Sequence, residues 1–275
     1  MTERDGEANE YVLGTHRVEL LRLGFQHQVW APHTSSLWQR AGFGPGKRLL
    51  DLGCGPGYAS FDLAHLAGAA GEVLAVDMSQ RFVDHLQEQA VCRGISNLRG
   101  EVQDVENLKV GADSLDGAFA RWVLCFTSDP GSVVAGAARA LRPGGRFAVM
   151  DYCHYRGLIV APHSPEIDRV ISATFLAVTR RGGNMDVGRD IPAMMRSCGL
   201  EVQSVQPIVR AARPGSALWK WPETFFLGYL TTLLEMELIT EDEAAGFRRA
   251  WTTRSADPSA YLFTPPMVEV IGVKV

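Results

Sequence analysis

Three closely spaced glycines are the residues of this chain that point most directly to chemistry. They lie in the segment Leu-Leu-Asp-Leu-Gly-Cys-Gly-Pro-Gly at 49–57. Glycine lets the backbone turn sharply and lets a ligand approach closely, and such a loop between a strand and a helix N-terminus is typical of nucleotide sites. The dinucleotide fingerprint is G-x-G-x-x-G, whereas this chain has G-x-G-x-G. It also contains no G-x-x-x-x-G-K-[ST] segment, so a P-loop is excluded.

The charge of Asp51, just before the loop, narrows the choice of cofactor. A carboxylate at this place would repel a pyrophosphate group, but it suits a ligand that carries a positive ammonium and a sulfonium. Charge complementarity therefore favours S-adenosylmethionine over a dinucleotide.

Acidic residues also follow the next two predicted strands. Asp77 lies about 20 residues past the loop, where an acidic side chain accepts hydrogen bonds from both ribose hydroxyls. Met78 can pack its polarizable sulfur on an adenine ring. Asp104 is placed to accept from the adenine amino group, and the backbone N–H of Val105 to meet a ring nitrogen. Taken singly, Asp77 is also a helix cap and Asp104 a turn residue, but the series favours adenosine binding.

Five motifs in this order and spacing resemble those of class I S-adenosylmethionine-dependent methyltransferases. They are LLDLGCGPG at 49–57, VLAVDMS at 73–79, VQDVENL at 102–108, ARWVLCF at 120–126 and LRPGG at 141–145. The resemblance is good from residue 48 to about residue 151 and loose elsewhere. It implies an α/β fold with a Rossmann-like seven-stranded sheet, the last strand antiparallel, flanked by helices. It implies S-adenosyl-L-methionine as cofactor and S-adenosyl-L-homocysteine as product.

The resemblance also implies a set of cofactor-binding residues. They are Gly53, Gly55, Asp77, Met78, Gln103, Asp104, Val105 and the end of the fourth strand near Arg121, with Tyr11 as an N-terminal tyrosine that closes over the methionine portion. Arg121 has two interpretations that stay open. A cation at the carboxyl end of a central strand can pair with the methionine carboxylate, or it can form an ordinary salt bridge at the edge of the sheet.

Methyl transfer requires that nucleophile, methyl group and sulfur are aligned, and some acceptors must also lose a proton. His154, just past the fifth predicted strand, is the candidate catalytic base, although a structural role is common for histidine. No metal site is predicted. An aromatic cluster could form a substrate pocket with the helix at 167–178 or could simply pack in the core. Its members are Trp219, Trp221, Phe225, Phe226 and Tyr229.

The elements that must position these residues alternate between strand and helix from residue 47 onward, which predicts a parallel sheet. We expect an N-terminal helical cap at 1–45, made of two helices separated at Pro32. The methyltransferase domain is expected at 46–275. Helical insertions near the C-terminus, at about 160–181 and 215–255, are interpreted as lid segments. The sequence Thr-Glu-Asp-Glu at 240–243 matches a capping box.

Composition limits the partners and the compartment. A net charge of −4 argues against the broad basic surface of a nucleic-acid binder. The five cysteines are scattered, and the acidic start does not resemble a signal peptide, so a cytoplasmic location is expected. The most apolar stretch, 224–239, is too short for a membrane span.

The sequence therefore predicts a methyltransferase that acts on an O, N or C atom of a small-molecule metabolite, for example in secondary metabolism or in ubiquinone or menaquinone biosynthesis. An NAD(P)-dependent reductase and a non-catalytic S-adenosylmethionine-binding module are the alternatives. The oligomeric state, including a homodimer, is left open.

Overall fold

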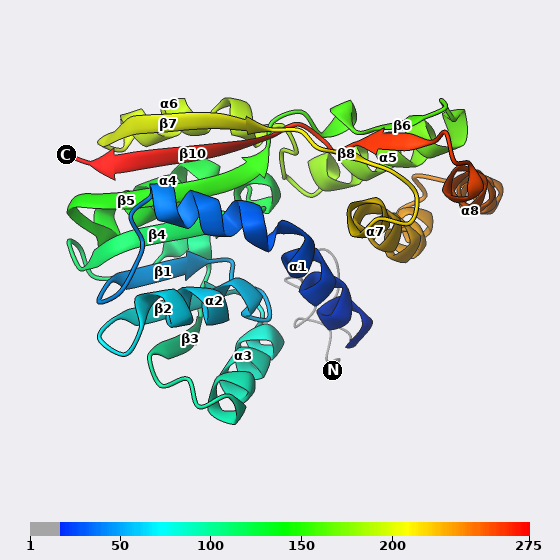
Figure 1. Ribbon diagram of the computed structural model, residues 1–275. Helices are drawn as coiled ribbons and strands as arrows, with labels where there is room; N and C mark the ends of the chain where they lie inside the picture. The colour runs from blue at the N-terminus through cyan, green and yellow to red at the C-terminus, as the bar shows by residue number, and fades with distance from the viewer. Residues whose placement is uncertain (1–16) are drawn as a thin grey trace, which may run out of the picture.

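The structure, a computed structural model, describes residues 17–275, so the predicted cofactor residue Tyr11 lies outside the described residues. Its centre is a seven-stranded sheet in the order β3-β2-β1-β4-β5-β10-β7 (Figure 1). The strands are β1 (Arg48–Leu52), β2 (Glu72–Asp77), β3 (Leu98–Val102), β4 (Leu115–Arg121), β5 (Leu141–Tyr152), β7 (Leu200–Ile208) and β10 (Met267–Lys274). The first five are parallel, and β10 runs antiparallel to both β5 and β7. This confirms the predicted fold class.

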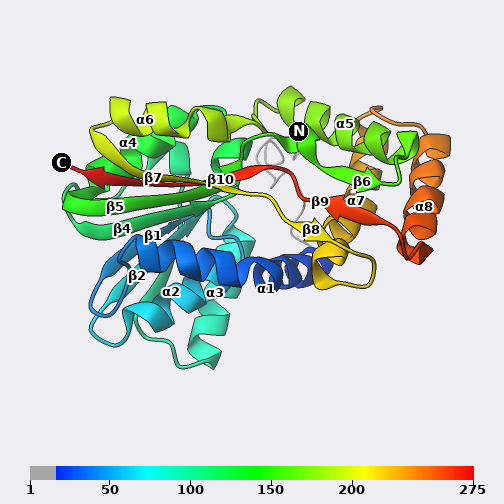
Figure 2. The same ribbon diagram turned by 45° about the horizontal axis from the view of Figure 1, so that its top comes forward.

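Helices cover both faces of this sheet. Figure 2 shows α1 (Arg17–Arg40), α2 (Tyr58–Ala67) and α3 (Gln80–Cys92) on one face, and α4 (Pro130–Ala140) and α6 (Ile191–Ser197) on the other. Because both faces are covered, the central strands are apolar along their length rather than alternating. In β1, for example, Leu49, Leu50 and Leu52 are all buried.

Two element boundaries differ from the sequence prediction. The two expected N-terminal helices form one continuous helix, α1, which includes Pro32 and changes direction along its length (Figure 1). A proline removes one helical hydrogen bond and bends a helix, but the packing of the helix on the sheet holds it together. Trp38 of α1, for example, packs edge-on against Phe119 of β4. The sequence predicts the fifth strand at residues 146–151, whereas β5 begins at Leu141, directly after α4 ends.

A second, three-stranded antiparallel sheet in the order β6-β9-β8 was not predicted. Its strands are β6 (Ile159–Ala161), β8 (Ala211–Ala212) and β9 (Tyr261–Phe263). Together with α5 (Pro165–Arg180), α7 (Ala217–Glu235) and α8 (Glu241–Ala256), it lies beyond the carboxyl ends of the parallel strands (Figures 1 and 2). The predicted capping box of α8 is present between Thr240 and Glu243. The division of the chain into cap, domain and lid segments stays a prediction.

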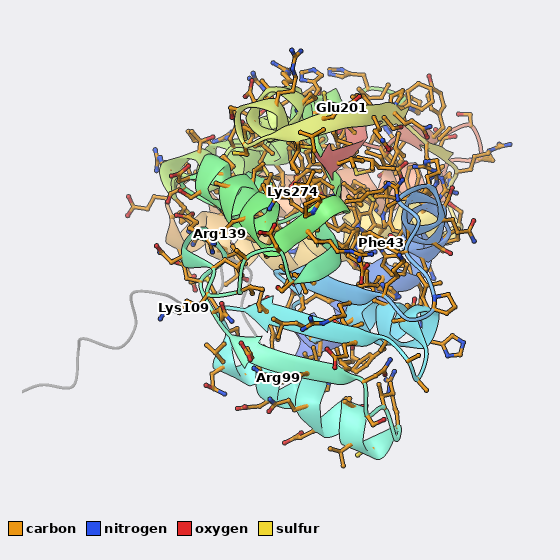
Figure 3. The ribbon with its side chains drawn as sticks, turned by 90° about the vertical axis from the view of Figure 1, so that its left-hand side faces the viewer. Phe43, Arg99, Lys109, Arg139, Glu201 and Lys274 are labelled. Carbon is orange, nitrogen blue, oxygen red and sulfur yellow. The ribbon has the colours of Figure 1, made fainter. Side chains whose placement is uncertain are left out.

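The opposite end of the sheet is held by polar contacts. Figure 3 looks onto this end, where Lys274 lies near the C-terminus of β10. Its ammonium donates to the carbonyl oxygen of Leu141 at 2.7 Å and to Asp113 Oδ1 at 2.8 Å. These contacts join the last strand to the start of β5 and to the loop before β4. Within residues 17–275, no helix is both long enough and apolar enough to cross a membrane.

Candidate functional site

A cavity opens at the carboxyl ends of β1, β4 and β5, where ligands bind in open α/β sheets. It encloses about 900 Å³ of empty space, a volume that includes open solvent at its mouth. Its walls come from the glycine loop, the start of α2, the N-terminal half of α1, the segments after β4 and β5, and α7. The central sheet and the helical additions therefore meet at one site.

The glycine loop has the conformation that its sequence requires. Gly53, Gly55 and Gly57 have φ values of 59°, 54° and 88°, which L side chains rarely adopt. A Cβ atom at Gly53 would lie 2.6 Å from Val123 Cγ2, whereas a Cβ at Gly55 would meet no atom within 4 Å. Gly55 lines the cavity, so its bare backbone leaves room there for a ligand to approach closely.

Asp77, the last residue of β2, holds this loop in place. Its Oδ2 accepts a hydrogen bond from the Gly55 N–H at 2.8 Å, and its Oδ1 accepts from the Ser79 N–H at 2.9 Å. Each carboxylate oxygen keeps a second lone pair that can accept from a hydroxyl. Burial raises the pKa of Asp77, and the backbone hydrogen bonds oppose this rise.

Four further predicted cofactor residues gather beside Asp77, because β2 and β3 are neighbours. The Gln103 N–H donates to the Asp77 carbonyl oxygen at 3.0 Å, and the exposed Met78 follows Asp77 directly. The Gln103 side chain is bound to Glu101 and to the Lys109 N–H. None of these residues lines the cavity as bounded by the described residues.

Asp104 and Val105 lie at the start of a short 3₁₀ helix, η1 (Val105–Asn107). Asp104 caps it by accepting from the Glu106 N–H at 2.9 Å and from the Asn107 amide at 2.6 Å. Asp104 can cap this helix and also accept a hydrogen bond from an adenine amino group, since each carboxylate oxygen has two lone pairs.

Asp51 is deeply buried beneath the loop rather than at the cavity wall. It is 2 % exposed, and its Oδ2 accepts from the Ser60 hydroxyl at 2.6 Å. Burial raises its pKa to about 7, while the Ser60 hydrogen bond and the charge of Arg121 oppose the rise. At neutral pH, Asp51 is therefore protonated in part of the molecules, whereas the argument from the sequence assumed a full negative charge.

Arg121, at the end of β4, lines the cavity and faces α1. Its guanidinium donates to Thr34 Oγ1 at 2.8 Å and to His27 Nδ1 at 3.2 Å. Because a guanidinium only donates, His27 must accept at Nδ1 and donate from Nε2 to Asp62 Oδ2, 2.9 Å away. Burial lowers the pKa of Arg121 to about 10, and Asp51 and Asp62 oppose the shift, so Arg121 stays cationic at neutral pH.

The structure does not bring His154 to the cavity. This histidine is exposed, and its Nδ1 lies 3.0 Å from Arg189 Nη2 and 4.0 Å from Asp186 Oδ2. Its neighbours Tyr152 and Tyr155 line the cavity instead. Tyr155 begins the short helix η3 (Tyr155–Gly157), which turns its ring inward while His154 stays outside.

Trp122 is the centre of an aromatic wall. It has a φ of 52°, which is rare for a bulky residue and is characteristic of functional sites. Its ring lies 5.8 Å from that of Trp221 at an angle of 20°, and 6.0 Å from that of Tyr152 at 19°. Tyr155 then packs edge-on against Tyr152 at 5.1 Å. The wall thus presents a series of rings, several of them nearly parallel.

The aromatic cluster predicted from the sequence is divided by the structure. Trp221, Phe225 and Phe226 of α7 line the cavity, whereas Trp219 and Tyr229 do not. The helix expected at 167–178, which is α5, does not line it either.

Sequence reasoning missed several cavity residues. Arg22 of α1 lines the cavity and binds Glu19 Oε2 through Nε at 2.7 Å. Tyr58, at the start of α2, donates its hydroxyl to the Leu20 carbonyl oxygen at 2.9 Å. Only their positions in the sequence could have indicated them. Tyr58 directly follows the glycine loop, and Arg22 lies in the predicted N-terminal cap. No three His, Cys, Asp or Glu side chains within 17–275 are grouped so that they could hold a metal ion.

Part of this chain is similar in sequence to known methyltransferases. A methyltransferase domain family matches residues 43–180. An arsenite methyltransferase of Halobacterium salinarum is 25% identical over 167 residues, which are 61% of this chain and 40% of that protein. Aklanonic acid methyltransferase DauC of a Streptomyces species is 32% identical over 103 residues, 38% of this chain and 47% of that protein. This chain thus spans about half the length of the curated relatives it matches.

Solved structures share the fold. A geranyl diphosphate methyltransferase, in complex with geranyl diphosphate and sinefungin, has a TM-score of 0.60 at 19% identity. The match covers 90% of this chain and 79% of that chain. A solved structure of a protein from Bacillus halodurans also has a TM-score of 0.60, at 16% identity, and the match covers 87% of this chain and 97% of that chain.

Proposed function

This chain belongs to the methyltransferase domain family, and on that premise we propose that it transfers a methyl group to an O, N or C atom of a small-molecule metabolite. The cofactor is S-adenosyl-L-methionine, and the product formed from it is S-adenosyl-L-homocysteine. One observation carries the proposal. The cavity connects a glycine loop, whose Gly55 leaves room for a ligand, with an aromatic wall on which an acceptor can pack.

The residues of the loop fit the cofactor. Gly53 and Gly55 would face its aminoacyl end, and Asp77 would accept from its ribose hydroxyls with the free lone pairs of its carboxylate. Met78, Gln103, Asp104 and Val105 would surround the adenine, since the ends of β2 and β3 place them together. These assignments are supported by the neighbouring positions of the residues and by their order in the sequence.

Arg121 would neutralise the methionine carboxylate, with Tyr11 as a further contact. Arg121 remains cationic at neutral pH and lines the cavity close to the loop. Its bonds to Thr34 and His27 fix the guanidinium and leave other N–H groups able to donate.

The bound cofactor supplies an electrophilic methyl group, and the task of the protein is alignment. The aromatic residues Trp122, Trp221 and Phe225 exclude water and orient the acceptor against the loop. The position of His154 outside the cavity argues against direct proton removal by this residue, so we do not retain it as the base.

We further propose that the partner is a small molecule and not a nucleic acid, and that the protein works in the cytoplasm, in metabolism of the secondary type. The net charge of −4 supports the first point. The helical segments α5, α7 and α8 would act as the lid, with α1 as the cap.

A screen with tritiated S-adenosylmethionine and fractions of a cell extract tests the proposed function. We expect label to pass into one or a few small organic molecules and not into protein or nucleic acid. A structure with S-adenosylhomocysteine would then show the free part of the cavity. Label found only in nucleic acid or protein would contradict the proposed acceptor class.

A further inference from the structure

The cavity offers hydrogen-bond donors but no obvious base. Among the described residues, its ionisable lining groups are Arg22, Cys54, Tyr58, Arg121, Tyr152 and Tyr155. No carboxylate and no histidine of the described residues lines it. An acceptor that must lose a proton therefore finds no ordinary proton acceptor at this wall.

Several carboxylates and a histidine on the elements around the cavity already have partners. On α1, Glu19 binds Arg22 and His27 binds Arg121. Asp62 of α2 binds His27, and Asp51 beneath the loop accepts from a serine hydroxyl.

Asp151, at the end of β5, is also unavailable as a base. It is fully buried and accepts from the N–H groups of Tyr152 and Cys125. Burial raises the pKa of Tyr152, Tyr155 and the Cys54 thiol, so all three stay protonated at neutral pH. These groups can donate a hydrogen bond but cannot readily remove a proton.

Two of these donors, both on cavity-lining residues, have no hydrogen-bond partner among the described residues. The hydroxyl groups of Tyr152 and Tyr155 make no hydrogen bond to any described residue, and neither is sealed away from the cavity. Burial is the main influence on the two phenols and raises the pKa of each, whereas the charge of Arg22, which is paired with Glu19, is a smaller influence that lowers it. The two phenol hydroxyls and the Arg22 guanidinium line one cavity, and donors of this kind suit an anionic oxygen.

The shape of the aromatic wall indicates the rest of the ligand. The ring of Trp122 lies at 20° to that of Trp221 and at 19° to that of Tyr152. Nearly parallel rings favour a flat ring system that can stack on them. A long flexible chain would gain less from this geometry.

We propose that the acceptor is a flat aromatic molecule with an acidic phenol or enol, bound as its anion, with the anionic oxygen held by Tyr152, Tyr155 and Arg22. This inference rests on the proposed function. The anionic oxygen forms the new bond to the methyl carbon, and the carbon–sulfur bond breaks with its electron pair going to sulfur. The proton is lost to solvent before binding, so no proton passes to the protein.

Binding of two matched probes tests this inference. The probes are 2-hydroxy-1,4-naphthoquinone, which ionises to an enolate, and 1,4-naphthoquinone, which has the same rings and no acidic group. Quenching of tryptophan fluorescence, with S-adenosylhomocysteine present, measures their affinities at a pH where the first probe is ionised. We expect the anion to bind about tenfold or more tightly, and its visible absorbance to show a lower pKa when bound.

Two variants test whether Tyr155 and Arg22 cause the preference for the anion. Tyr155→Phe and Arg22→Gln should each reduce the preference for the anion several-fold, while Tyr261→Phe, on the exposed face of β9, should leave it unchanged. Arg22→Gln could fail to fold, because Arg22 also binds Glu19. In that case the affinities of Tyr155→Phe for the two probes still test the anion site.

The outcomes separate this inference from the proposed function. Equal affinity for the two probes, or a raised pKa of the bound enol, overturns the anion site. Calorimetry with S-adenosylmethionine is run in parallel. Failure to bind the cofactor would count against the proposed function, whereas cofactor binding without preference for the anion would overturn only this inference.

Discussion

Asp77 combines a structural and a binding role in one side chain. It fixes the glycine loop through the Gly55 N–H and retains lone pairs for the ribose. We expect Asp77→Asn to weaken S-adenosylmethionine binding by about 1–3 kcal/mol, as for a lost hydrogen bond to a charged group. Isothermal titration calorimetry measures this, with Asp84→Asn on the exposed side of α3 as the matched control. Unchanged affinity in the Asp77 variant would refute the assigned role.

Asp51 gives a prediction for pH. Burial raises its pKa in the folded state to about 7 from the ordinary value of 3.8, so its contribution to stability is present at low pH and is lost as pH rises through 7. Asp51→Asn cannot ionise, and wild type should lose stability relative to this variant between about pH 4 and 7. The slope should be at most about 1.4 kcal/mol per pH unit.

Urea unfolding of both proteins at pH 5 and pH 8 measures this difference. The amide oxygen of the asparagine can also accept a hydrogen bond from the Ser60 hydroxyl, so the comparison isolates the effect of the charge on stability. A stability difference that is independent of pH would show that Asp51 does not titrate in this range.

Residues whose role depends on the local turn could not be predicted. Tyr155 and His154 are adjacent in sequence, yet the 3₁₀ turn that follows β5 buries one and exposes the other. Trp122 reaches the cavity because its backbone adopts a positive φ, which no composition or periodicity reveals. Asp77 was predictable because its place depends only on the end of a strand.

At the scale of elements, the glycine loop must pass close to the segment after β4. We expect Gly53→Ala to destabilise the fold and weaken cofactor binding, because its Cβ would lie 2.6 Å from Val123 Cγ2 at a φ of 59°. Gly144→Ala is the matched control, since Gly144 has a φ of 77° and open space around its Cβ position. Backbone strain of about 1–2 kcal/mol is then common to both variants.

Thermal unfolding and calorimetry measure the additional effect of the clash. We expect a larger loss of stability for the Gly53 variant than for the Gly144 variant, and a loss of cofactor affinity for the Gly53 variant alone. Equal losses in the two variants would show that the contact with Val123 is easily relieved.

Long periodic elements were predictable, whereas short ones were not. Strands β1 and β3, which the sequence predicts at residues 48–52 and 98–102, have these bounds, because apolar runs and turn residues mark their ends. The small sheet was missed because β6, β8 and β9 have only two or three residues each and come from distant parts of the chain. The continuity of α1 through Pro32 depends on packing that the sequence does not show.

For the whole molecule, α1 is the element that joins the sheet to the helical additions. Tyr58 binds its backbone at Leu20, and Trp221 of α7 donates to Gln26 Oε1 at 3.0 Å. A cofactor bound beneath these contacts should slow their opening. We expect S-adenosylhomocysteine to reduce hydrogen exchange in 17–40 and 217–235 more than in β7.

Hydrogen exchange with mass spectrometry, with and without the ligand, checks this expectation. Strand β7 lies at the far edge of the sheet and is the internal control. Equal protection in all three segments would argue against α1 and α7 as a cap and lid over the site.

The choice of cofactor is the central claim, and calorimetric titration of the whole chain tests it most directly. S-adenosylmethionine and NADPH are titrated separately under the same conditions. The account predicts one saturable site for S-adenosylmethionine and its product and no measurable heat of binding for NADPH. Tight binding of NADPH without binding of S-adenosylmethionine would contradict it.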